Sequence, residues 1–256
     1  MSDDQRNEMH NVLNMAAGSS CSPLTQSQCD PAEKKHRKEL VLFGRMLHKR
    51  HYVSGCDGNL SVRMDGDRVL TTPTGMCKAL LKPEHMVLVD LQGRKLDGHL
   101  QPSTELQMHL TIYQRRPDVG AVVHAHPCVA TGIGCAGMSL TEPICSELVL
   151  TLGEIPLAPY AVPGTPALSE SLLPFIFDHE AILMQNHGVV AYGQTLSQAY
   201  LNMETVEHSA RIMLVARLMG SQKVLDTEQV CHLLDLKAKR RAPRAHLRAE
   251  NSNSHS

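Results

Sequence analysis

The sequence predicts an α/β fold in which helices lie in layers around a mixed sheet. Strand and helix patterns follow one another without strict β-α alternation, which argues against a doubly wound parallel sheet. The 256 residues suit one large domain, because no segment in the middle of the chain has the composition of a linker. An apolar fraction of 42% is sufficient for a buried core.

Charge and hydropathy exclude several classes of partner. The formal charge of −1 gives no reason to expect nucleic acid or an anionic membrane. No run approaches the ~20 apolar residues of a membrane-spanning helix, and the polar start has no signal-peptide pattern. Eight cysteines without a C-x-x-C pair are typical of reduced thiols. We therefore expect a cytoplasmic protein.

The first helix is predicted to begin near residue 31, after a poorly ordered extension over residues 1–30 that has no apolar periodicity. Asp30 can cap this helix, and Pro31 stands where a missing N–H costs nothing. Apolar residues follow at helical spacing and would form its buried stripe, namely Leu40, Phe43 and Leu47.

Three strand patterns follow the first helix. Residues 58–64 and 68–75 predict two strands joined by an Asp-Gly-Asp turn, and residues 85–96 predict a strand that enters a second turn. A second helix is expected from Ser103, as its N-cap, to about residue 116. The carboxylate of Glu105 would then lie in the first turn, where the helix dipole favours an anion.

The second half of the chain alternates apolar runs with helical patterns. Residues 181–193 hold two apolar runs around Asn-His-Gly, which predicts a tight turn between strands. The remaining segments are an apolar strand over 119–126, a loop and helix over 158–177, a helix over 197–219, a last helix over 227–240, and a disordered tail over 241–256.

The sequence "VVHAHP" places His124 and His126 two residues apart in a predicted strand. Alternate residues of a strand point to the same face, about 6.6 Å apart at ~3.3 Å rise per residue, so both rings can reach one metal ion. An ordinary pair of buried histidines at the end of a core strand is the alternative interpretation.

Two further residues extend this pair to a possible ligand set. His187 lies at the turn between two apolar strands, and Glu105 lies at a helix start. Three imidazoles and one carboxylate suit catalytic zinc, although histidine ligands also suit Mn²⁺ or Fe²⁺. His109 follows Glu105 by one helical turn, and we assign it a structural role because the other three histidines fill the imidazole positions.

Three segments with free backbone N–H groups indicate an anion site. The motifs "GNLS" (58–61), "TPTG" (72–75) and "PSTE" (102–105) combine Gly or Pro with small polar side chains at strand or helix ends. Backbone donors and a helix dipole bind anions without a lysine. Singly each motif is an ordinary turn, but together with the ligand set they suggest a phosphate held beside the ion.

The ordered motifs "GNLS", "TPTG", "PSTE", "VVHAHP" and "QNHG" resemble the zinc-dependent class II aldolase and adducin head-domain family, the group of L-fuculose-1-phosphate aldolase. The resemblance covers about residues 33–235. It implies a three-layer α/β/α sandwich with a central mixed, largely antiparallel sheet, formed by a domain over residues 31–240. It also implies a homotetramer with active sites between subunits.

The resemblance implies a role for each motif residue. His124, His126 and His187 would bind one Zn²⁺ per subunit. Glu105 would be the fourth ligand and, once substrate displaces it, the catalytic acid/base. The substrate phosphate would be held by Asn59, Thr74, Gly75, Ser103 and Thr104.

One departure from the family concerns the aldehyde half of the substrate. In the family's sugar-phosphate aldolases, a tyrosine from the adjacent subunit exchanges a proton with the aldehyde's hydroxyl. The matching stretch "EPICSELVL" has none; Ser146 lies nearest, with Glu147 beside it, and the closest tyrosines are Tyr113 and Tyr160. We hypothesise that Glu147 takes this acid/base role.

These features lead first to a metal-dependent lyase that performs reversible aldol cleavage of a small phosphorylated keto-sugar through an enediolate. The alternative is decarboxylation of a phosphorylated 3-oxo acid, which forms the same enediolate without the tyrosine. An epimerase is less favoured because those relatives carry Asp where this chain has Glu105. A dehydratase or an iron oxygenase could use the same metal site, whereas an adducin-like interaction module has no need of the ligand set.

Overall fold

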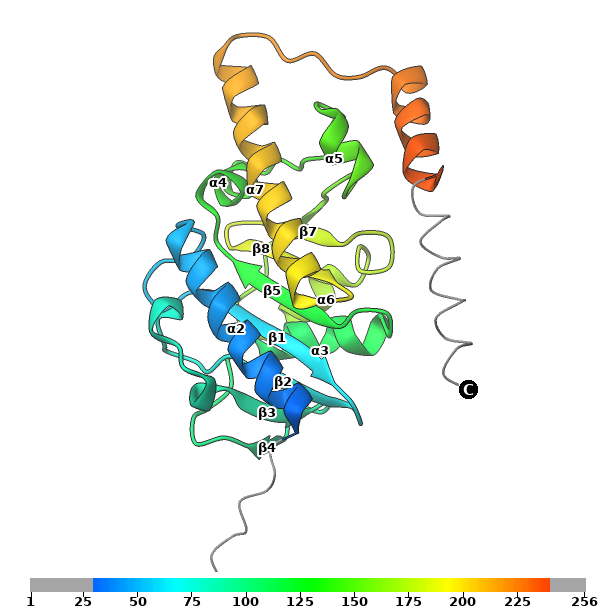
Figure 1. Cartoon of the computed structure of the whole chain (residues 1–256). Helices are drawn as coiled ribbons and strands as arrows, with labels where there is room; N and C mark the ends of the chain where they lie inside the picture. Colours follow the sequence, from blue (N-terminus) through cyan, green and yellow to red (C-terminus); the bar gives the residue numbers. More distant parts are fainter. Residues whose placement is uncertain (1–29, 240–256) are drawn as a thin grey trace, which may run out of the picture. The chain divides into compact units, whose positions relative to one another are not determined.

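The computed structural model describes residues 30–239 of the chain (Figure 1). The expected N-terminal extension and C-terminal tail therefore lie outside the described residues, except for Asp30. The fold described below belongs to the unit that begins at Ala32.

A sheet of eight strands forms the centre of this unit, in the order β4-β3-β2-β1-β5-β8-β7-β6. Neighbouring strands pair antiparallel, except for β6 and β7, which are parallel. The predicted mixed, largely antiparallel sheet is thus confirmed. The strands are β1 (Asn59–Met64), β2 (Arg68–Thr71), β3 (Val87–Asp90), β4 (Lys95–Asp97), β5 (Ala121–Ala125), β6 (Leu157–Ala158), β7 (Ala181–Met184) and β8 (Gly188–Gly193).

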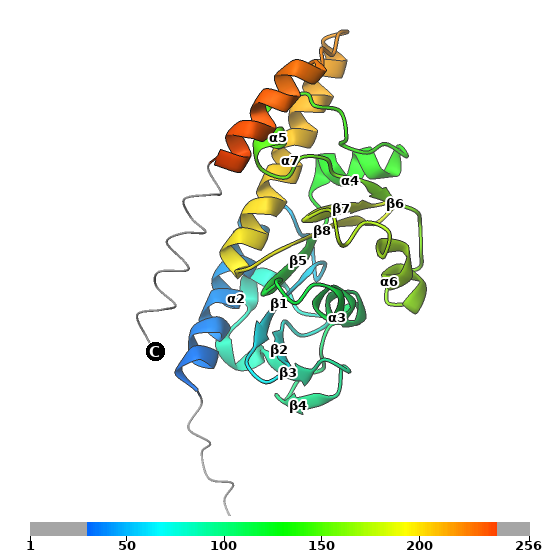
Figure 2. The same cartoon turned by 90° about the vertical axis from the view of Figure 1, so that its right-hand side faces the viewer.

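Helices cover both faces of the sheet, which confirms the three-layer sandwich. Figure 2 shows α2 and α7 on one side of the strands and α3 and α6 on the other. The α-helices are α2 (Pro31–Lys49), α3 (Leu106–Arg115), α4 (Cys128–Cys135), α5 (Ser146–Leu150), α6 (Pro166–Leu172) and α7 (Leu196–Leu218), followed by a helix over 227–239. Two short 3₁₀ helices span Lys78–Leu80 and Pro83–His85.

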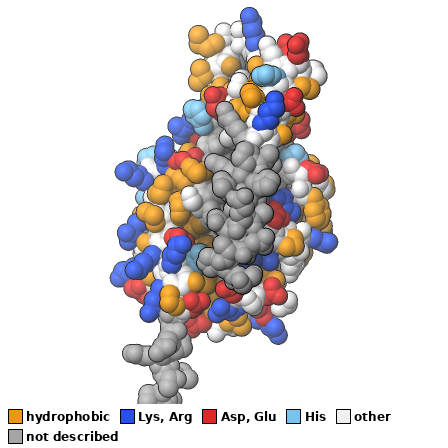
Figure 3. Space-filling view, turned by 45° about the vertical axis from the view of Figure 1, so that its right-hand side comes forward, with side chains coloured by type: hydrophobic (Ala, Val, Ile, Leu, Met, Phe, Trp, Pro, Cys, Tyr) orange, Lys and Arg blue, Asp and Glu red, His pale blue; other side chains and the backbone are white. Residues whose placement is uncertain are grey.

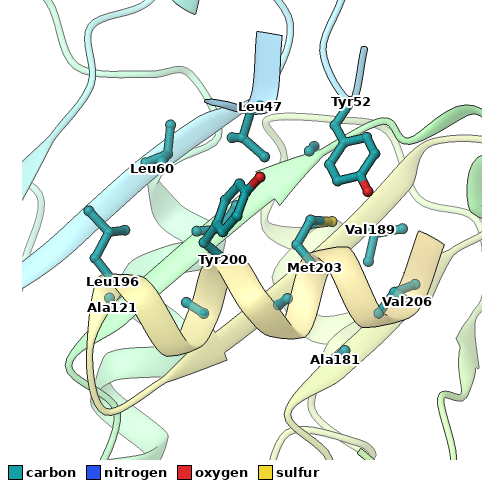
Figure 4. Close-up of a cluster of buried hydrophobic side chains, with 14 of the residues drawn as sticks. Leu47, Tyr52, Leu60, Ala121, Ala181, Val189, Leu196, Tyr200, Met203 and Val206 are labelled. Atoms are coloured by element: carbon teal, nitrogen blue, oxygen red, sulfur yellow. The ribbon is translucent and has the colours of Figure 1, made fainter. Parts of the chain in front are cut away.

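The two faces of the sheet bury two separate apolar clusters. On the α7 face, Tyr200, Met203 and Val206 pack with the strand residues Leu60 and Val189 (Figure 4). The other cluster lies between the sheet and helices α3 and α6. Each fully buried large apolar side chain stabilises the fold by roughly 1.5–3 kcal/mol.

Strand β5 contributes to both clusters in alternation. Val123 and Ala125 belong to the α7 cluster, whereas Val122 belongs to the α3 cluster. His124 therefore points to the α3 face. Because β1 pairs with β5 so that Asn59 lies opposite His124, the polar end of β1 reaches the same place.

The prediction that Ser103 caps the second helix is wrong. Helix α3 begins at Leu106, with Glu105 at the N-cap. The residues before Glu105 are paired with another segment instead. Pro102 forms an antiparallel β-bridge with Pro73, and the N–H of Thr74 donates to the carbonyl of Gln101. The Ser103 hydroxyl accepts a hydrogen bond from the Glu105 N–H, a local turn rather than a helix cap.

Other boundaries differ for similar local reasons. Strand β2 ends at Thr71 rather than near residue 75, since Pro73 has no N–H to donate to a ladder. Helix α7 begins one residue earlier than expected, after Thr195, whose side chain accepts from the Gln198 N–H. The short helices α4 and α5 were not expected.

Between residues 30 and 239, no helix has the combined length and hydropathy of a bilayer-spanning segment. The face in Figure 3 shows positive and negative side chains interspersed rather than gathered by sign.

Candidate metal centre

Three histidines from two places in the fold meet at one end of β5. Ring nitrogens of His124, His126 and His187 lie within 4.8 Å of one another, and the Nε2 atoms of His124 and His126 are 3.1 Å apart. His124 belongs to β5, His126 follows it directly, and His187 lies in the turn between β7 and β8. Because β8 pairs antiparallel with β5, that turn lies beside the end of β5.

Backbone contacts orient two of the three imidazoles. Nδ1 of His124 lies 2.9 Å from the carbonyl oxygen of Val189, so Nδ1 donates to that carbonyl and Nε2 is the nitrogen that faces the other rings. The backbone N–H of His126 donates to the carbonyl of Tyr52. A carboxylate oxygen of Asp57 lies 3.7 Å from Nδ1 of His126.

Glu105 completes the cluster from the N-terminus of α3. Its carboxylate oxygens lie 3.2 Å from Nε2 of His124 and 2.9 Å from Nε2 of His187. The side-chain amide of Asn59 donates to Oε2 of Glu105 at 2.9 Å. The Glu105 side chain is only 13% exposed, so these contacts lie largely away from water.

The charges of this cluster shift its pKa values in opposite directions. Burial raises the pKa of Glu105, but His124 and His187 outweigh it and hold this pKa well below its usual value. Burial lowers the pKa of His124, but the Glu105 carboxylate more than compensates and raises it. Burial, with the positive charges of the other two histidines, lowers the pKa of His126 to about 3. The cluster therefore contains an ionised carboxylate.

These residues fit a divalent metal ion. Imidazole nitrogens and carboxylate oxygens are the usual protein ligands of zinc and are shared by Mn²⁺ and Fe²⁺ sites. Oε1 of Glu105 is a buried anionic oxygen whose contact is Nε2 of His187, at 2.9 Å. A buried carboxylate that contacts two of three clustered imidazoles is part of a donor set that a dication would satisfy.

Two glycines permit the close backbone approach at this centre. A Cβ on Gly188 would lie 2.5 Å from the ring of His126 and 2.7 Å from the carbonyl of Ala125. Gly58 has a φ of +72°, and a Cβ there would lie 2.8 Å from the carbonyl oxygen of His124. Both positions therefore require glycine.

The three segments that the sequence predicts to bind an anion also meet beside Glu105. The "TPTG" and "PSTE" segments are joined by the Pro73–Pro102 bridge, and the N–H of Thr72 donates to the carbonyl of Leu60, in "GNLS". The structure thus brings the predicted residues together. Asn59 is buried and Ser103 is half-buried, whereas three of them are exposed: Thr74, Gly75 and Thr104.

His109 lies outside the ligand cluster. It is buried between α3 and the sheet, with Nδ1 2.7 Å from the hydroxyl of Ser61, which in turn lies 2.8 Å from the hydroxyl of Tyr113. Burial, assisted by the positive charge of His124, lowers the pKa of His109 to about 3. Its contacts are those of a neutral core histidine.

The residues considered for the aldehyde half lie in different places. Glu147, on α5, lines a cavity against α7 that includes Arg50 and His208 and none of the clustered histidines. The Tyr113 hydroxyl is buried against Ser61. Tyr160 is 56% exposed, on a loop whose Gly164 approaches the carbonyl of Thr104.

Two residues beside the centre were not predicted from the sequence. Asp57 lies near His126, and Lys78 is buried behind the "TPTG" segment with its ammonium bonded to backbone carbonyls. A lysine within the otherwise apolar stretch "MCKALL" was the available signal for the second. Nothing in the sequence marks Asp57, because acidic residues are common in turns.

Comparison with known families gives one match over most of the chain. The sequence model of the Class II Aldolase and Adducin N-terminal domain matches residues 38–214. This range includes all of the clustered histidines and Glu105.

Curated relatives divide between two activities. The 3-oxo-tetronate 4-phosphate decarboxylase of Pectobacterium atrosepticum is 34% identical over 197 residues, which cover 75% of this chain and 88% of that protein. The 5-deoxy-D-ribulose 1-phosphate aldolase of Bacillus thuringiensis is 31% identical over 202 residues, covering 78% and 94%. Both alignments span nearly the whole relative.

A solved structure shares this fold. The L-fuculose-1-phosphate aldolase of Thermus thermophilus superposes with a TM-score of 0.66 and 32% identity, over 76% of this chain and all of that chain.

Proposed function

The chain belongs to the class II aldolase and adducin family, and we propose that it removes carbon dioxide from a small phosphorylated 3-oxo sugar acid. The protein is a metal-dependent carbon–carbon lyase, as its relatives are. Decarboxylation and aldol cleavage both break a bond next to a carbonyl-bearing carbon and leave an enediolate. The two reactions differ in what leaves: carbon dioxide in one, an aldehyde in the other.

One observation carries the choice of decarboxylation. The cluster that would serve the enediolate is complete in one chain, whereas the segment expected to serve the aldehyde, residues 142–150, contains no tyrosine. Carbon dioxide needs no proton when it leaves, so a decarboxylase does not require that group. The order of the two reactions expected from the sequence is therefore reversed in this proposal.

The metal centre would be held by the three histidines with Glu105 beside them. When bound, the dication supplies Lewis-acid stabilisation of the negative charge that develops on the substrate oxygens. Neutral imidazoles leave that positive charge undiminished. We propose zinc, one ion per subunit, with Mn²⁺ or Fe²⁺ as alternatives that metal analysis distinguishes.

Glu105 would carry the proton during the reaction. Glu105 would be ionised before substrate binds, and it would accept the proton of the substrate's C2 hydroxyl as a general base. The bond between the carboxylate carbon and C2 then breaks, carbon dioxide leaves, and its electron pair remains on the C2–C3 enediolate. Glu105 delivers its proton to C2, and a proton from water restores the hydroxyl at C2, which gives the phosphorylated hydroxyketone.

The anion motifs would orient the substrate by its phosphate. Asn59, Thr74, Gly75, Ser103 and Thr104 surround the place where their segments meet beside Glu105. The exposed residues Thr74 and Thr104 and the half-buried Ser103 offer hydroxyl donors that suit a phosphate ester entering from solvent. Asn59 would also hold Glu105 in position through its hydrogen bond.

Aldol cleavage of a phosphorylated keto-sugar is the second candidate. It is favoured by the similarity to the deoxyribulose phosphate aldolase and by Tyr160, an exposed hydroxyl on the loop next to Thr104. We further propose that the protein acts as a homotetramer in the cytoplasm, as the sequence analysis expects.

Product analysis on purified protein tests the proposal. Zinc-, manganese- and iron-loaded forms are incubated with phosphorylated 3-oxo acids, and released carbon dioxide is measured. The same forms are mixed with dihydroxyacetone phosphate and aldehydes, and adducts are sought. Carbon dioxide without adducts supports decarboxylation, whereas adducts without carbon dioxide support the aldolase. Protein that purifies without stoichiometric metal would instead fit a non-catalytic module.

A further inference from the structure

Lys78 is a buried cation beside the anion motifs. Only 1% of its surface is exposed, although lysine is almost never fully buried without a counter-charge. Its ammonium donates to the carbonyl oxygens of Cys56, at 3.0 Å, and Met76, at 2.7 Å.

The charge of this ammonium is not neutralised by an ion pair. No carboxylate within residues 30–239 lies within 4.0 Å of it, and two carbonyl oxygens satisfy two of its three N–H donors. Burial lowers the pKa of Lys78, while neighbouring thiol and carboxyl groups, including Glu105, oppose that shift. An anion that binds near this buried, unneutralised ammonium would therefore stabilise its positive charge.

The two carbonyl partners place the ammonium between the segments of the anion site. Cys56 lies three residues before Asn59, and Met76 directly follows Gly75. The Lys78 side chain thus joins two residues that flank the "GNLS" and "TPTG" segments. Helix α2 closes this region from outside, because a Cβ on Gly44 would lie 3.4 Å from the Lys78 carbonyl.

We infer that Lys78 is a positioning residue of the phosphate site, whose buried charge joins the two segments and attracts the dianion they hold. This inference rests on the proposed phosphorylated substrate. It deepens that function by assigning the phosphate preference to a residue that none of the anion motifs contains. A purely structural clip would need the hydrogen bonds of Lys78 but not its charge.

The inference is tested by binding of inorganic phosphate to the zinc-loaded protein, measured by calorimetry. Lys78→Gln and Lys78→Met should each weaken phosphate binding by about tenfold or more, because a charge-assisted site loses its cation. Lys78→Arg should restore most of the affinity. The exposed Lys82→Met is the matched control, with the same charge change in the next turn, and should bind phosphate like the wild type.

Kinetics separate a charge role from a structural one. With a phosphorylated substrate, Lys78→Gln should raise KM by about the same factor while kcat and zinc content stay near wild-type values. Equal phosphate affinity in wild type and Lys78→Gln overturns the inference. So does loss of affinity in Lys78→Arg to the same extent as in Lys78→Gln.

Hydrogen exchange of the wild type keeps the inference testable if the variants fail to fold. Phosphate should slow exchange at residues 56–59 and 72–78, and unchanged exchange there overturns the inference. Phosphate binding requires no turnover, so the two proposals fail separately. One combination of results would contradict the proposed function alone. In it, the wild type turns over no phosphorylated substrate, yet phosphate binds the wild type and binds Lys78→Gln more weakly.

Discussion

From the N-cap position of α3, the Glu105 side chain contacts two imidazoles and accepts a hydrogen bond from the amide of Asn59. These contacts fix both carboxylate oxygens. A general acid/base held in this way contributes typically about 10²–10⁴ to a rate.

Glu105→Gln should therefore lower turnover by about 10²–10⁴. The amide has nearly the same shape but cannot carry the proton, and it is a weaker metal ligand. Turnover is measured together with metal content by mass spectrometry. The control is the exposed neighbour Gln107→Glu, which should keep both. Full turnover in a Glu105→Gln variant that still binds metal would contradict the assigned role.

Glu147→Gln distinguishes the two candidate reactions. If Glu147 replaces the family's tyrosine, this variant should slow any aldol cleavage by about 10²-fold. Carbon dioxide release should not change, because that reaction has no aldehyde half. Both rates are measured on zinc-loaded protein. Unchanged aldol turnover, with zinc still bound, would dispose of the hypothesis about Glu147.

At the residue scale, the three histidines and Glu105 could be predicted from the sequence, because their spacing and motifs are local. Asn59 was assigned to the phosphate, and its contact with Glu105 was not foreseen, since that contact joins β1 to α3 across 46 positions. Lys78 was missed for a related reason. Its partners are backbone carbonyls, which every residue has, so no residue type reveals them.

At the scale of elements, the β7–β8 hairpin brings His187 to the end of β5. The hairpin pairs with β5 residue by residue, and its first β8 residue, Gly188, lies against His126. The register of two strands therefore decides whether the ligands meet.

Gly188→Ala should change the geometry of the proposed metal centre while all of its proposed ligands are kept. The added methyl would lie 2.5 Å from the His126 ring, and overpacking of this kind costs about 1–3 kcal/mol. We expect lower thermal stability and metal binding weaker by about tenfold or more. Gly132→Ala in α4 is the control, because its Cβ would meet nothing within 4 Å. It should stabilise the helix by roughly 0.5–1 kcal/mol.

Strong periodic elements were predictable, and elements set by distant contacts were not. The α7 pattern and its Thr195 cap are local, so its bounds were missed by one residue only. The N-cap of α3 lies two residues later than the predicted Ser103, because the Pro73–Pro102 bridge holds the preceding segment extended. Helices α4 and α5 are short and depend on packing against the rest of the fold, which weak local propensity does not reveal.

At the scale of the whole molecule, the proposed ion would join β5, α3 and the β7–β8 turn. Removing a ligand that binds only the folded state lowers its stability by about 2.7 kcal/mol when the ligand is present at 100 times its Kd. The fold should therefore depend measurably on the metal.

Chelation should lower Tm by roughly 5–10 °C for a domain of this size. Differential scanning calorimetry with and without a chelator measures the shift, and added zinc should reverse it. His187→Ala supplies the control, since a variant without a complete centre should show little response. An equal shift in both proteins would mean that the chelator acts elsewhere.

We also expect four chains in the assembled protein. The C-terminal end of α7 exposes large apolar side chains, with Leu218 76% and Met219 79% exposed, and such surfaces are often buried between subunits. Light scattering after size exclusion should give four times the mass of one chain. A monomer that retains full activity would contradict the tetramer.

The separation of the ligands along the sequence has a consequence for synthesis of the protein. Glu105, the 124/126 pair and His187 come from three stretches far apart in the chain. A nascent chain on the ribosome offers an ion only the first two of these stretches until the β7–β8 turn has emerged. The complete set of proposed ligands is therefore available only after His187 has left the ribosome.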